Sequence, residues 1–295
     1  MSAEKTKNIS REDKNAIVGG TLYLVSTPIG NLSDITSRSL KVLSEVDFIA
    51  AEDTRNGGKL LAFFQISKPM VSYYEHNKRQ RGEYIVSRIE AGESCALITD
   101  AGTPAISDPG EDIVKLCAER GLPVTSIPGA CAVVTALTLS ALPTGRFVFD
   151  GFLSTAKGER KEHLESLKNE TRTIILYEAP HKLKVTLADL LSHLGNRKIS
   201  LCRELTKMNE EIFRCDIESA VAHYAETAPR GEYVLVIEGA KQSSVAQSKC
   251  WDAMTIAEHV EFYTNEKKFS KMDAIKAAAK DRGVPKNEVY REINV

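Results

Sequence analysis

Residues 98–110 read ITDAGTPAISDPG, and this stretch decides how the rest of the chain is interpreted. It follows an apolar, strand-like run and precedes a segment with helical spacing. Gly102 permits a tight turn, Pro104 and Pro109 restrict the backbone, and the carboxylates Asp100 and Asp108 stand among few apolar neighbours. Because open α/β sheets bind ligands at the carboxyl ends of their strands, this loop either only turns the chain or also binds a ligand.

Apolar runs rich in β-branched residues alternate with helical patterns along the whole chain. Strands are predicted at 21–25, 48–51, 95–99, 124–127, 173–177, 199–202 and 233–237, and helices at 37–43, 111–120, 130–140 and 181–194. Strands and helices in alternation predict the α/β fold class, with largely parallel sheets covered by helices on both faces.

The chain divides at two compositional breaks. ALPTGR at 141–146 ends a helix of small residues with Pro and Gly, and KQSSVAQS at 241–248 is polar and without pattern. We therefore predict a flexible extension at 1–18, an N-terminal α/β domain at 19–143, a C-terminal α/β domain at 144–241 and a helical tail at 249–295.

Composition excludes several classes of protein. With 39 basic and 40 acidic residues among 295, only a local patch can hold a polyanion. No apolar run reaches the roughly 18 residues of a membrane span, so we expect a soluble protein with no membrane partner. The cysteines show no CxxC pair or zinc spacing, which predicts free thiols in a reducing cytoplasm and no metal site. They are Cys95, Cys117, Cys131, Cys202, Cys215 and Cys250.

The tail has the pattern of two short helices joined by a Gly turn. Ser270 and Asp273 have the form of a capping box, and the first helix should end at Gly283. Its apolar face is predicted from Met272, Ile275 and Ala279, and a second helix starting at Val284-Pro285 carries Val289. Residues 267–291 hold eight Lys or Arg against three Asp or Glu. This helix-turn-helix-like tail is therefore either a solvated cap or a contact for a phosphate backbone.

Two more loops follow predicted strands, and none of the three has a standard nucleotide motif such as GxGxxG or GxxxxGK[ST]. STPIGNLSDIT at 26–36 carries Pro28 and Gly30, with Ser33 or Asp34 expected to cap the next helix; a plain strand-to-helix turn explains it equally well. SIPGACAVVTAL at 126–137 starts a helix whose small residues permit close approach of a flat ligand.

Eight motifs in order carry a resemblance to a known family. They are TPIGNLSDIT, AEDTR at 51–55, YEHN at 74–77, DAGTPAISDPG, PGACAVVTAL, YEAPHK at 177–182, RELTK at 203–207 and RGEYVLVIEG at 230–239. Together they resemble the bacterial 16S ribosomal RNA (cytidine 2′-O) methyltransferases of the tetrapyrrole methylase superfamily. The resemblance spans about residues 20–240, and the basic tail resembles the small C-terminal helical domain of those enzymes.

The resemblance implies a homodimer of two-domain α/β subunits that binds S-adenosylmethionine in the cleft between the domains. The implied reaction is 2′-O-methylation of a decoding-centre cytidine, with 16S rRNA or the assembled small ribosomal subunit as partner. The residues implied around the cofactor are Pro28, Asp100, Gly102, Ile106, Ala130, Cys131, Tyr177, Leu205 and Glu232.

Candidate catalytic residues lie in AEDTR and YEHN. Asp53 is a candidate to accept the proton or orient the ribose, Arg55 to hold a flanking phosphate, and His76 to serve as an alternative base. The competing interpretations are that Glu52 or Asp53 caps the next helix, and that His76 is a hydrogen-bonded structural residue.

Basic and aromatic residues are candidates for RNA contact. Lys78, Arg79 and Arg81 form a compact basic group, and Tyr73, Tyr74 and Phe152 are possible stacking surfaces. Glu178, His181 and Glu204, with the basic residues of RELTK, either face the RNA or form a structural ion-pair network. The other predicted RNA-binding residues are Arg203, Lys207, Lys271 and Lys276.

Two other functions are compatible with the pattern. One is a methylase of the same superfamily that acts on a tetrapyrrole or other small substrate, which has little need for a basic tail. The other is a non-catalytic RNA-binding protein that uses the cleft for a nucleotide.

Overall fold

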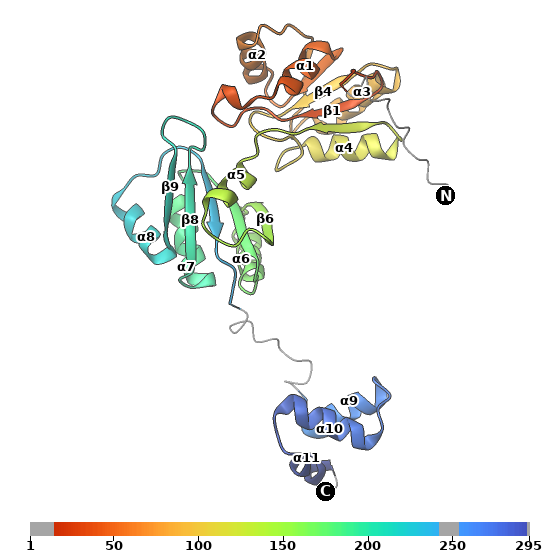
Figure 1. The fold of residues 1–295 in the computed structure, drawn as a ribbon, viewed down its shortest axis with the longest axis vertical. Helices are drawn as coiled ribbons and strands as arrows, with labels where there is room; N and C mark the ends of the chain where they lie inside the picture. Colours follow the sequence, from red (N-terminus) through yellow and green to blue (C-terminus); the bar gives the residue numbers. More distant parts are fainter. Residues whose placement is uncertain (1–14, 242–253, 294–295) are drawn as a thin grey trace. The chain divides into compact units, whose positions relative to one another are not determined.

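The computed structural model describes residues 15–241 and 254–293, and the chain divides into two compact units, residues 1–240 and 241–295. The first unit contains two five-stranded sheets with their helices, and the second contains three helices (Figure 1). Most of the predicted extension at 1–18, most of the polar break at 241–248 and Cys250 lie outside the described residues.

The first sheet is entirely parallel, with strand order β3-β2-β4-β1-β5. Its apolar side chains alternate between two cores, and each core is completed by two helices, because both faces of a parallel sheet must be covered. The strands are β1 (Leu22–Val25), β2 (Phe48–Ala51), β3 (Met70–Ser72), β4 (Cys95–Ile98) and β5 (Val124–Ile127). Helices α1 (Ser37–Glu45) and α2 (Thr54–Phe63) cover one face, and α3 (Lys78–Glu90) and α4 (Gly110–Glu119) cover the other.

The order of the strands places a topological switch point between β1 and β4. These strands are neighbours, yet β1 leads to α1 on one face whereas β4 leads to α4 on the opposite face. The two loops therefore diverge at adjacent carboxyl ends, which is where α/β sheets open a crevice for ligands. Thr27 and Gly102 bridge the start of this crevice with backbone hydrogen bonds of 2.9 and 3.1 Å.

The second sheet is mixed, with strand order β6-β7-β10-β8-β9. Only β6 and β7 pair in parallel; the other three pairings are antiparallel. The prediction of largely parallel sheets is therefore right for the first sheet and wrong for the second, because β8 and β9 form a hairpin and β10 returns between β7 and β8. The strands are β6 (Phe147–Phe152), β7 (Thr173–Glu178), β8 (Lys198–Arg203), β9 (Glu211–Asp216) and β10 (Tyr233–Ile237).

One helix from the first half covers a face of this second sheet. Val133, Ala136 and Leu137 of α5 (Ala132–Leu139) pack on the inward side chains of β7, β8 and β10. The opposite face is covered by α6 (Lys157–Leu167), α7 (Leu183–Leu194) and α8 (Ile217–Glu226). The small-residue helix predicted at 130–140 is thus the element that joins the two halves of the unit.

Several short elements have no clear pattern in the sequence. Strand β3 has three half-buried residues, β6 contains Asp150 and Gly151, and β9 is an edge strand without a fully buried residue. Helix α3 begins with a charged segment, KRQRGEY, that hides its apolar positions. The sequence analysis assigned no ranges to these elements or to α2, α6 and α8, although Asp53 and Asp216 provide local N-caps for α2 and α8.

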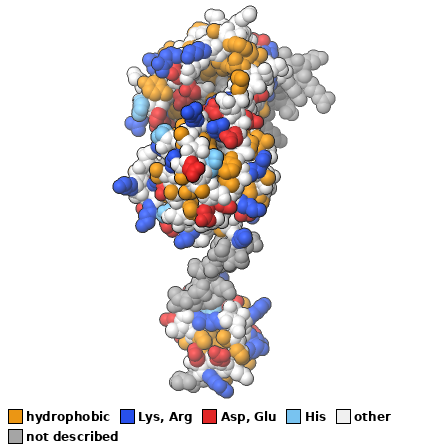
Figure 2. All heavy atoms as spheres, turned by 90° about the vertical axis from the view of Figure 1, so that its left-hand side faces the viewer, with side chains coloured by type: hydrophobic (Ala, Val, Ile, Leu, Met, Phe, Trp, Pro, Cys, Tyr) orange, Lys and Arg blue, Asp and Glu red, His pale blue; other side chains and the backbone are white. Residues whose placement is uncertain are grey.

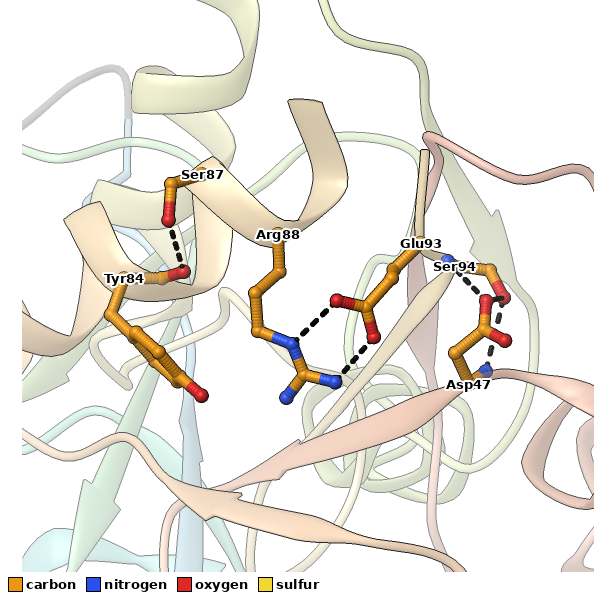
Figure 3. Close-up of polar contacts among 6 residues, drawn as sticks. All are labelled: Asp47, Tyr84, Ser87, Arg88, Glu93 and Ser94. Atoms are coloured by element: carbon orange, nitrogen blue, oxygen red, sulfur yellow. Dashed lines mark hydrogen bonds and ion pairs between the residues drawn. The ribbon is translucent and has the colours of Figure 1, made fainter. Parts of the chain in front are cut away.

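Polar contacts fasten the amino-terminal edge of the first sheet (Figure 3). The Asp47 carboxylate accepts hydrogen bonds of 2.7 Å from the backbone N–H and the hydroxyl of Ser94, joining the starts of β2 and β4. Arg88 of α3 pairs with Glu93, and its guanidinium carbon lies 3.6 Å from the ring centre of Phe48. These contacts lie at the opposite edge from the switch point, so their role is to stabilise the sheet.

In its described residues, 254–293, the second unit has three helices rather than the predicted pair. It contains α9 (Ile256–Asn265), α10 (Lys271–Arg282) and α11 (Lys286–Ile293). Ser270 caps α10 and Gly283 ends it with φ 66°, as predicted, and Val289 is fully buried. The predicted apolar face is wrong at Met272, which is 59% exposed, since the buried stripe is Ala274, Ile275, Ala278 and Ala279.

Surface charge is mixed over the α/β unit. On the face shown in Figure 2, Lys and Arg side chains are interspersed with Asp and Glu.

Within the described parts of the chain, every helix is too short or too polar to cross a bilayer.

Candidate active site

A cavity of about 520 Å³ lies in the first unit, between the carboxyl ends of the first sheet and strands of the second. Its size is that of a pocket for a nucleoside-sized ligand. Seven of the nine residues predicted around the cofactor line it: Asp100, Gly102, Ile106, Cys131, Tyr177, Leu205 and Glu232. Pro28 precedes Ile29, which lines the cavity, and Ala130 precedes Cys131.

The stretch at 98–110 forms one wall of this cavity. Ala105 and Ser107 have φ values of 68° and 62°, in the left-handed region that costs a residue with a Cβ about 1–2 kcal/mol. The Asp108 carboxylate offsets this cost, since its Oδ1 accepts hydrogen bonds from the N–H groups of Ala105 and Gly110. The loop therefore has a rigid, strained shape, which is typical of binding sites.

The three loops singled out in the sequence converge. The Thr103 hydroxyl donates to the Ala130 carbonyl at 3.0 Å and lies 3.1 Å from the Ser26 hydroxyl. One side chain thus ties together the loops that follow β1, β4 and β5. The helix cap predicted at Ser33 or Asp34 is wrong: these residues lie in a 3-10 turn (Leu32–Asp34), and Thr36 caps α1.

A second strained loop forms the opposite wall. Glu204 and Thr206 of RELTK have φ values of 50° and 64°. The loop packs on Gly30, where an added Cβ would overlap Lys207 Cγ, and the Asn31 N–H donates to the Thr206 hydroxyl at 3.1 Å. Gly30 is needed here because the two halves of the unit approach too closely for any side chain.

Two carboxylates lie together at the cavity wall. Thr99 donates to Glu52 Oε2 at 2.7 Å, and Asn56 donates to Asp100 Oδ2 at 3.3 Å. Desolvation and the neighbouring Glu52 charge raise the pKa of Asp100 above its ordinary value. A carboxylate with a raised pKa beside a cavity is suited to accept a proton at neutral pH.

The predicted catalytic residues lie outside the lining of the cavity. Asp53 caps α2 and pairs with Arg55 by side-chain hydrogen bonds, which, with a backbone hydrogen bond from Arg55, lower the pKa of Asp53 to about 2. Arg55 is 86% exposed at its side chain. His76 is exposed, and its ring contacts Tyr74 edge to face. Asp53 is thus a poor base, but the Asp53–Arg55 pair adjoins Glu52 at the cavity wall.

The predicted RNA-binding residues fall into two groups. Lys78 pairs with Glu75 and Asp112, Arg203 with Glu211, and Lys207 with both Glu204 and Glu232, so RELTK does form an ion-pair network. Lys276 pairs with Asp273 within the second unit. Among the described residues, Arg79, Arg81 and Lys271 have no ion-pair partner.

The aromatic candidates differ in access. Tyr73 is only 1% exposed and donates its hydroxyl proton to the Pro109 carbonyl, so it supports the cavity loop from behind and is no stacking surface. Phe152 lines the cavity and is 56% exposed, with its ring centre 5.5 Å from that of Tyr177. Burial raises the pKa of Tyr177 to about 12, so its hydroxyl stays protonated and can donate a hydrogen bond.

Sequence reasoning missed several residues of the cavity. The pattern suggests only a helix-cap role for Glu52, although this residue directly precedes Asp53 and follows β2. It indicates no ligand role for Thr103 and Asp108, and only the convergence of three loops shows their part in the wall. The signal that the sequence offered for these residues was their position. Glu52 immediately follows β2, and Thr103 and Asp108 lie in the loop that follows β4.

The cavity suits a flat, amino-bearing ligand with a charged end. An apolar slot is formed by Ile29, Ile106, Leu205 and Val234. At Gly102, which has no side chain, the backbone itself lines the cavity. Asp108 Oδ2 is buried and has no hydrogen-bond partner among the described residues, so an acceptor is left for a ligand N–H or O–H. S-Adenosylmethionine has these features: an adenine with an exocyclic amine, ribose hydroxyls and an ammonium group.

Comparisons with known proteins agree with the fold. A family model described as tetrapyrrole (corrin/porphyrin) methylases matches residues 21–221. The chain is 47% identical to ribosomal RNA small subunit methyltransferase I of Halalkalibacterium halodurans, over 95% of each chain. It is 48% identical to the protein of that name from Bacillus subtilis, over 92% of this chain and 93% of the relative.

Solved structures share the fold at low identity. Diphthine synthase superposes with a TM-score of 0.58 at 14% identity, over 74% of this chain and 90% of that one. Uroporphyrin-III C-methyltransferase of Thermus thermophilus complexed with S-adenosyl homocysteine superposes with a TM-score of 0.53 at 18% identity, over 74% of this chain and 97% of that one. With a matching family model over two thirds of its length and relatives at nearly half identity, the chain belongs to the tetrapyrrole (corrin/porphyrin) methylase family.

Proposed function

We propose that the chain methylates the 2′-hydroxyl of a decoding-centre cytidine in 16S ribosomal RNA, with S-adenosylmethionine as methyl donor. The observation that carries the proposal is the identity of nearly half, over more than nine tenths of both chains, with relatives named ribosomal RNA small subunit methyltransferase I. The cavity supports it, because its lining matches a nucleoside-sized ligand with several amine and hydroxyl donors.

Two strained loops of this chain would hold the methyl donor. The wall at 98–110 offers Gly102 and the region of Ile106, and the opposite wall offers Leu205 and Glu232. The donor supplies an already activated methyl group on a sulfonium, so the protein is left to align the acceptor hydroxyl and to take up its proton. Alignment alone supplies roughly 7–11 kcal/mol of the barrier reduction.

We assign the proton acceptor to the Glu52–Asp100 pair rather than to Asp53. Asp100 lines the cavity and has a raised pKa, whereas the pKa of Asp53 is lowered to about 2 by Arg55. The Asp53–Arg55 pair then orients the ribose and its flanking phosphate, with the guanidinium as an exposed donor. Phe152 offers an exposed ring at the cavity for an unstacked base.

The remaining predictions stay part of this proposal. Arg79, Arg81 and Lys271 would contact the phosphate backbone, and His76 contributes near the ribose only if the substrate reaches beyond the cavity. The homodimer implied by the resemblance is tested by sedimentation of the purified protein.

The experiment is methyl transfer from radiolabelled S-adenosylmethionine to small ribosomal subunits and to protein-free 16S RNA that lack the modification. We expect label on a single cytidine, at the ribose, found by mass mapping of nuclease fragments. Transfer to a tetrapyrrole precursor and not to RNA would replace the proposal by a small-substrate methylase. Failure to bind S-adenosylmethionine by calorimetry would favour a non-catalytic RNA-binding protein.

Within the active site, Asp100→Asn and Asp53→Asn form a matched pair. We expect Asp100→Asn to lower kcat by about 10²–10⁴ with little change in KM for RNA, as the loss of a general base does. Asp53→Asn should act mainly on KM, because it frees Arg55 from its pair. If instead Asp53→Asn lowers kcat and Asp100→Asn acts mainly on KM, the general base is Asp53.

A further inference from the structure

A second hollow of about 540 Å³ lies on the outer face of the second sheet, between α6 and α7. We call it the α6–α7 groove. Six of its ten lining residues are Lys, Arg or His, five of them within two short segments, and Asp189 is the only carboxylate among the ten. The basic side chains are Lys157, Arg160, Lys161, His181 and Lys182, and His193 adds a sixth further along α7.

The floor of the groove is preorganised around Arg160. Its Nε donates to Asp189 at 2.8 Å and one terminal nitrogen donates to the Thr186 hydroxyl at 2.9 Å, so the side chain is only 15% exposed. Thr186 in turn donates to Glu178, which is 4% exposed and lines the active-site cavity. This chain of hydrogen bonds fixes the groove and the cavity to each other through α7.

The charges at the groove are only partly compensated. Arg160 is neutralised by Asp189, and His193 is hydrogen-bonded to Glu165. Across the described residues, by contrast, no carboxylate lies within ion-pair distance of Lys157, Lys161 or Lys182. The groove therefore presents three ammonium groups that form no ion pair with a carboxylate in the described parts of the chain. The full sequence of 295 residues has a formal net charge of −1, so these groups form a local basic patch.

The linings of the groove and of the active-site cavity come near each other along the chain at two places. Phe152 lines the cavity and Thr155 lines the groove; similarly, Pro180 lines the cavity and His181 the groove. Both transitions lie at the carboxyl ends of the parallel strands β6 and β7. Three residues of extended chain span at most about 11 Å, so the linings of the two hollows come within about that distance of each other.

We propose that the α6–α7 groove binds the ribose-phosphate backbone of the substrate RNA next to the nucleotide held in the active-site cavity. The inference rests on the proposed function, since it takes the substrate to be RNA. An anionic, repeating polymer fits the observations, because the ammonium groups can bind phosphates and the short distance between the two linings allows one strand to reach both. An acidic protein segment or a second copy of this chain would be the alternative occupants.

The test compares Lys161→Gln/Lys182→Gln with a matched control, Lys168→Gln/Lys184→Gln. Both doubles remove two charges from the α6 and α7 segments, but Lys168 and Lys184 lie outside the groove. Binding of the full-length protein to protein-free 16S RNA is measured by filter retention over a salt series. S-Adenosylmethionine affinity is measured by calorimetry, as a check that each variant is folded.

We expect the groove variant to bind RNA roughly 10- to 15-fold more weakly at 0.15 M salt, with the slope of log K against log salt reduced by about 1.4, since each single-strand phosphate contact contributes about 0.7. The control should retain affinity within about twofold, and both variants should bind S-adenosylmethionine like the parent. Equal behaviour of the two doubles would overturn the proposal.

Other outcomes point to other occupants. If the groove variant loses affinity for assembled subunits but not for protein-free RNA, the groove docks a ribosomal protein and the proposal is wrong. If its sedimentation changes while RNA affinity does not, the groove is an interface between copies. If the parent binds RNA through the groove but transfers no methyl group to it, the RNA-binding role of the groove is supported and the proposed methyl transfer to RNA is refuted.

Discussion

Gly102→Val tests whether the loop at 98–110 is a rigid wall of the methyl-donor cavity. Gly102 has φ 86°, and a Cβ there would lie 3.3 Å from Ile29 Cγ2 and 3.7 Å from the Ala130 carbonyl oxygen. The left-handed conformation costs valine about 1–2 kcal/mol. Its two methyl groups must also displace Ile29 or break the Thr27–Gly102 bridge, whose two hydrogen bonds contribute about 1 kcal/mol each.

The expected loss of stability is therefore about 3–4 kcal/mol, or roughly 6–16 °C in Tm for a unit of this size. Because Ile29 lines the cavity, its displacement should weaken S-adenosylmethionine binding about tenfold or more. Thermal unfolding followed by circular dichroism and titration calorimetry measure the two effects separately.

Gly121→Val is the matched control. Gly121 also has a positive φ, 68°, but a Cβ added there would have no atom within 4 Å among the described residues. It should show only the backbone cost of about 1–2 kcal/mol and no change in S-adenosylmethionine affinity. If the two variants are equally stable and both bind the methyl donor like the parent, the argument for a rigid binding wall is refuted.

Three further predictions concern the rest of the molecule. The hydrogen bonds from Ser94 lower the pKa of Asp47, so this carboxylate stabilises the fold above its unfolded pKa of about 3.9 and loses that contribution as pH falls through the folded pKa. Asp47→Asn should therefore lower the free energy of unfolding at pH 7 and make it depend less steeply on pH in the acid range. An unchanged dependence on pH would contradict this. Gly30→Ala should reduce methyl transfer because its Cβ would overlap Lys207, and a fully active variant would show that the RELTK loop moves freely. Deleting residues 248–295 should weaken RNA methylation more than S-adenosylmethionine affinity, whereas equal losses in both assays would make the tail a folding cap.

The α/β class, the seven principal strands and the caps of α10 were predictable because they depend on local pattern. Alternating β-branched runs and helical spacing need no knowledge of distant residues. Pairing direction in the second sheet does depend on such knowledge: the apolar run at 233–237 reads the same whether its neighbours are parallel or antiparallel. The prediction failed there for that reason.

The candidate site divides in the same way. Gly102, Asp100 and the other residues of strand-end loops are predictable because their position after a strand carries the signal. The sequence pattern favours Asp53 over Glu52 as the catalytic base, although only the fold shows that Asp53 faces Arg55 while Glu52 reaches Thr99 and the cavity. Neighbouring carboxylates have the same chemistry in a sequence, and only the fold shows that Arg55 lowers the pKa of Asp53.

By itself, the sequence determined that this chain builds strand-to-helix loops rich in Gly and Pro, since these residues restrict the backbone wherever they stand. The tertiary structure alone decided that three of those loops meet at Thr103, that Gly30 lies against the distant RELTK loop, and that lysines of the α6 and α7 segments line one groove. The physical reason is that binding sites and charged grooves are made by convergence of distant segments, whereas local conformation follows from each residue and its neighbours.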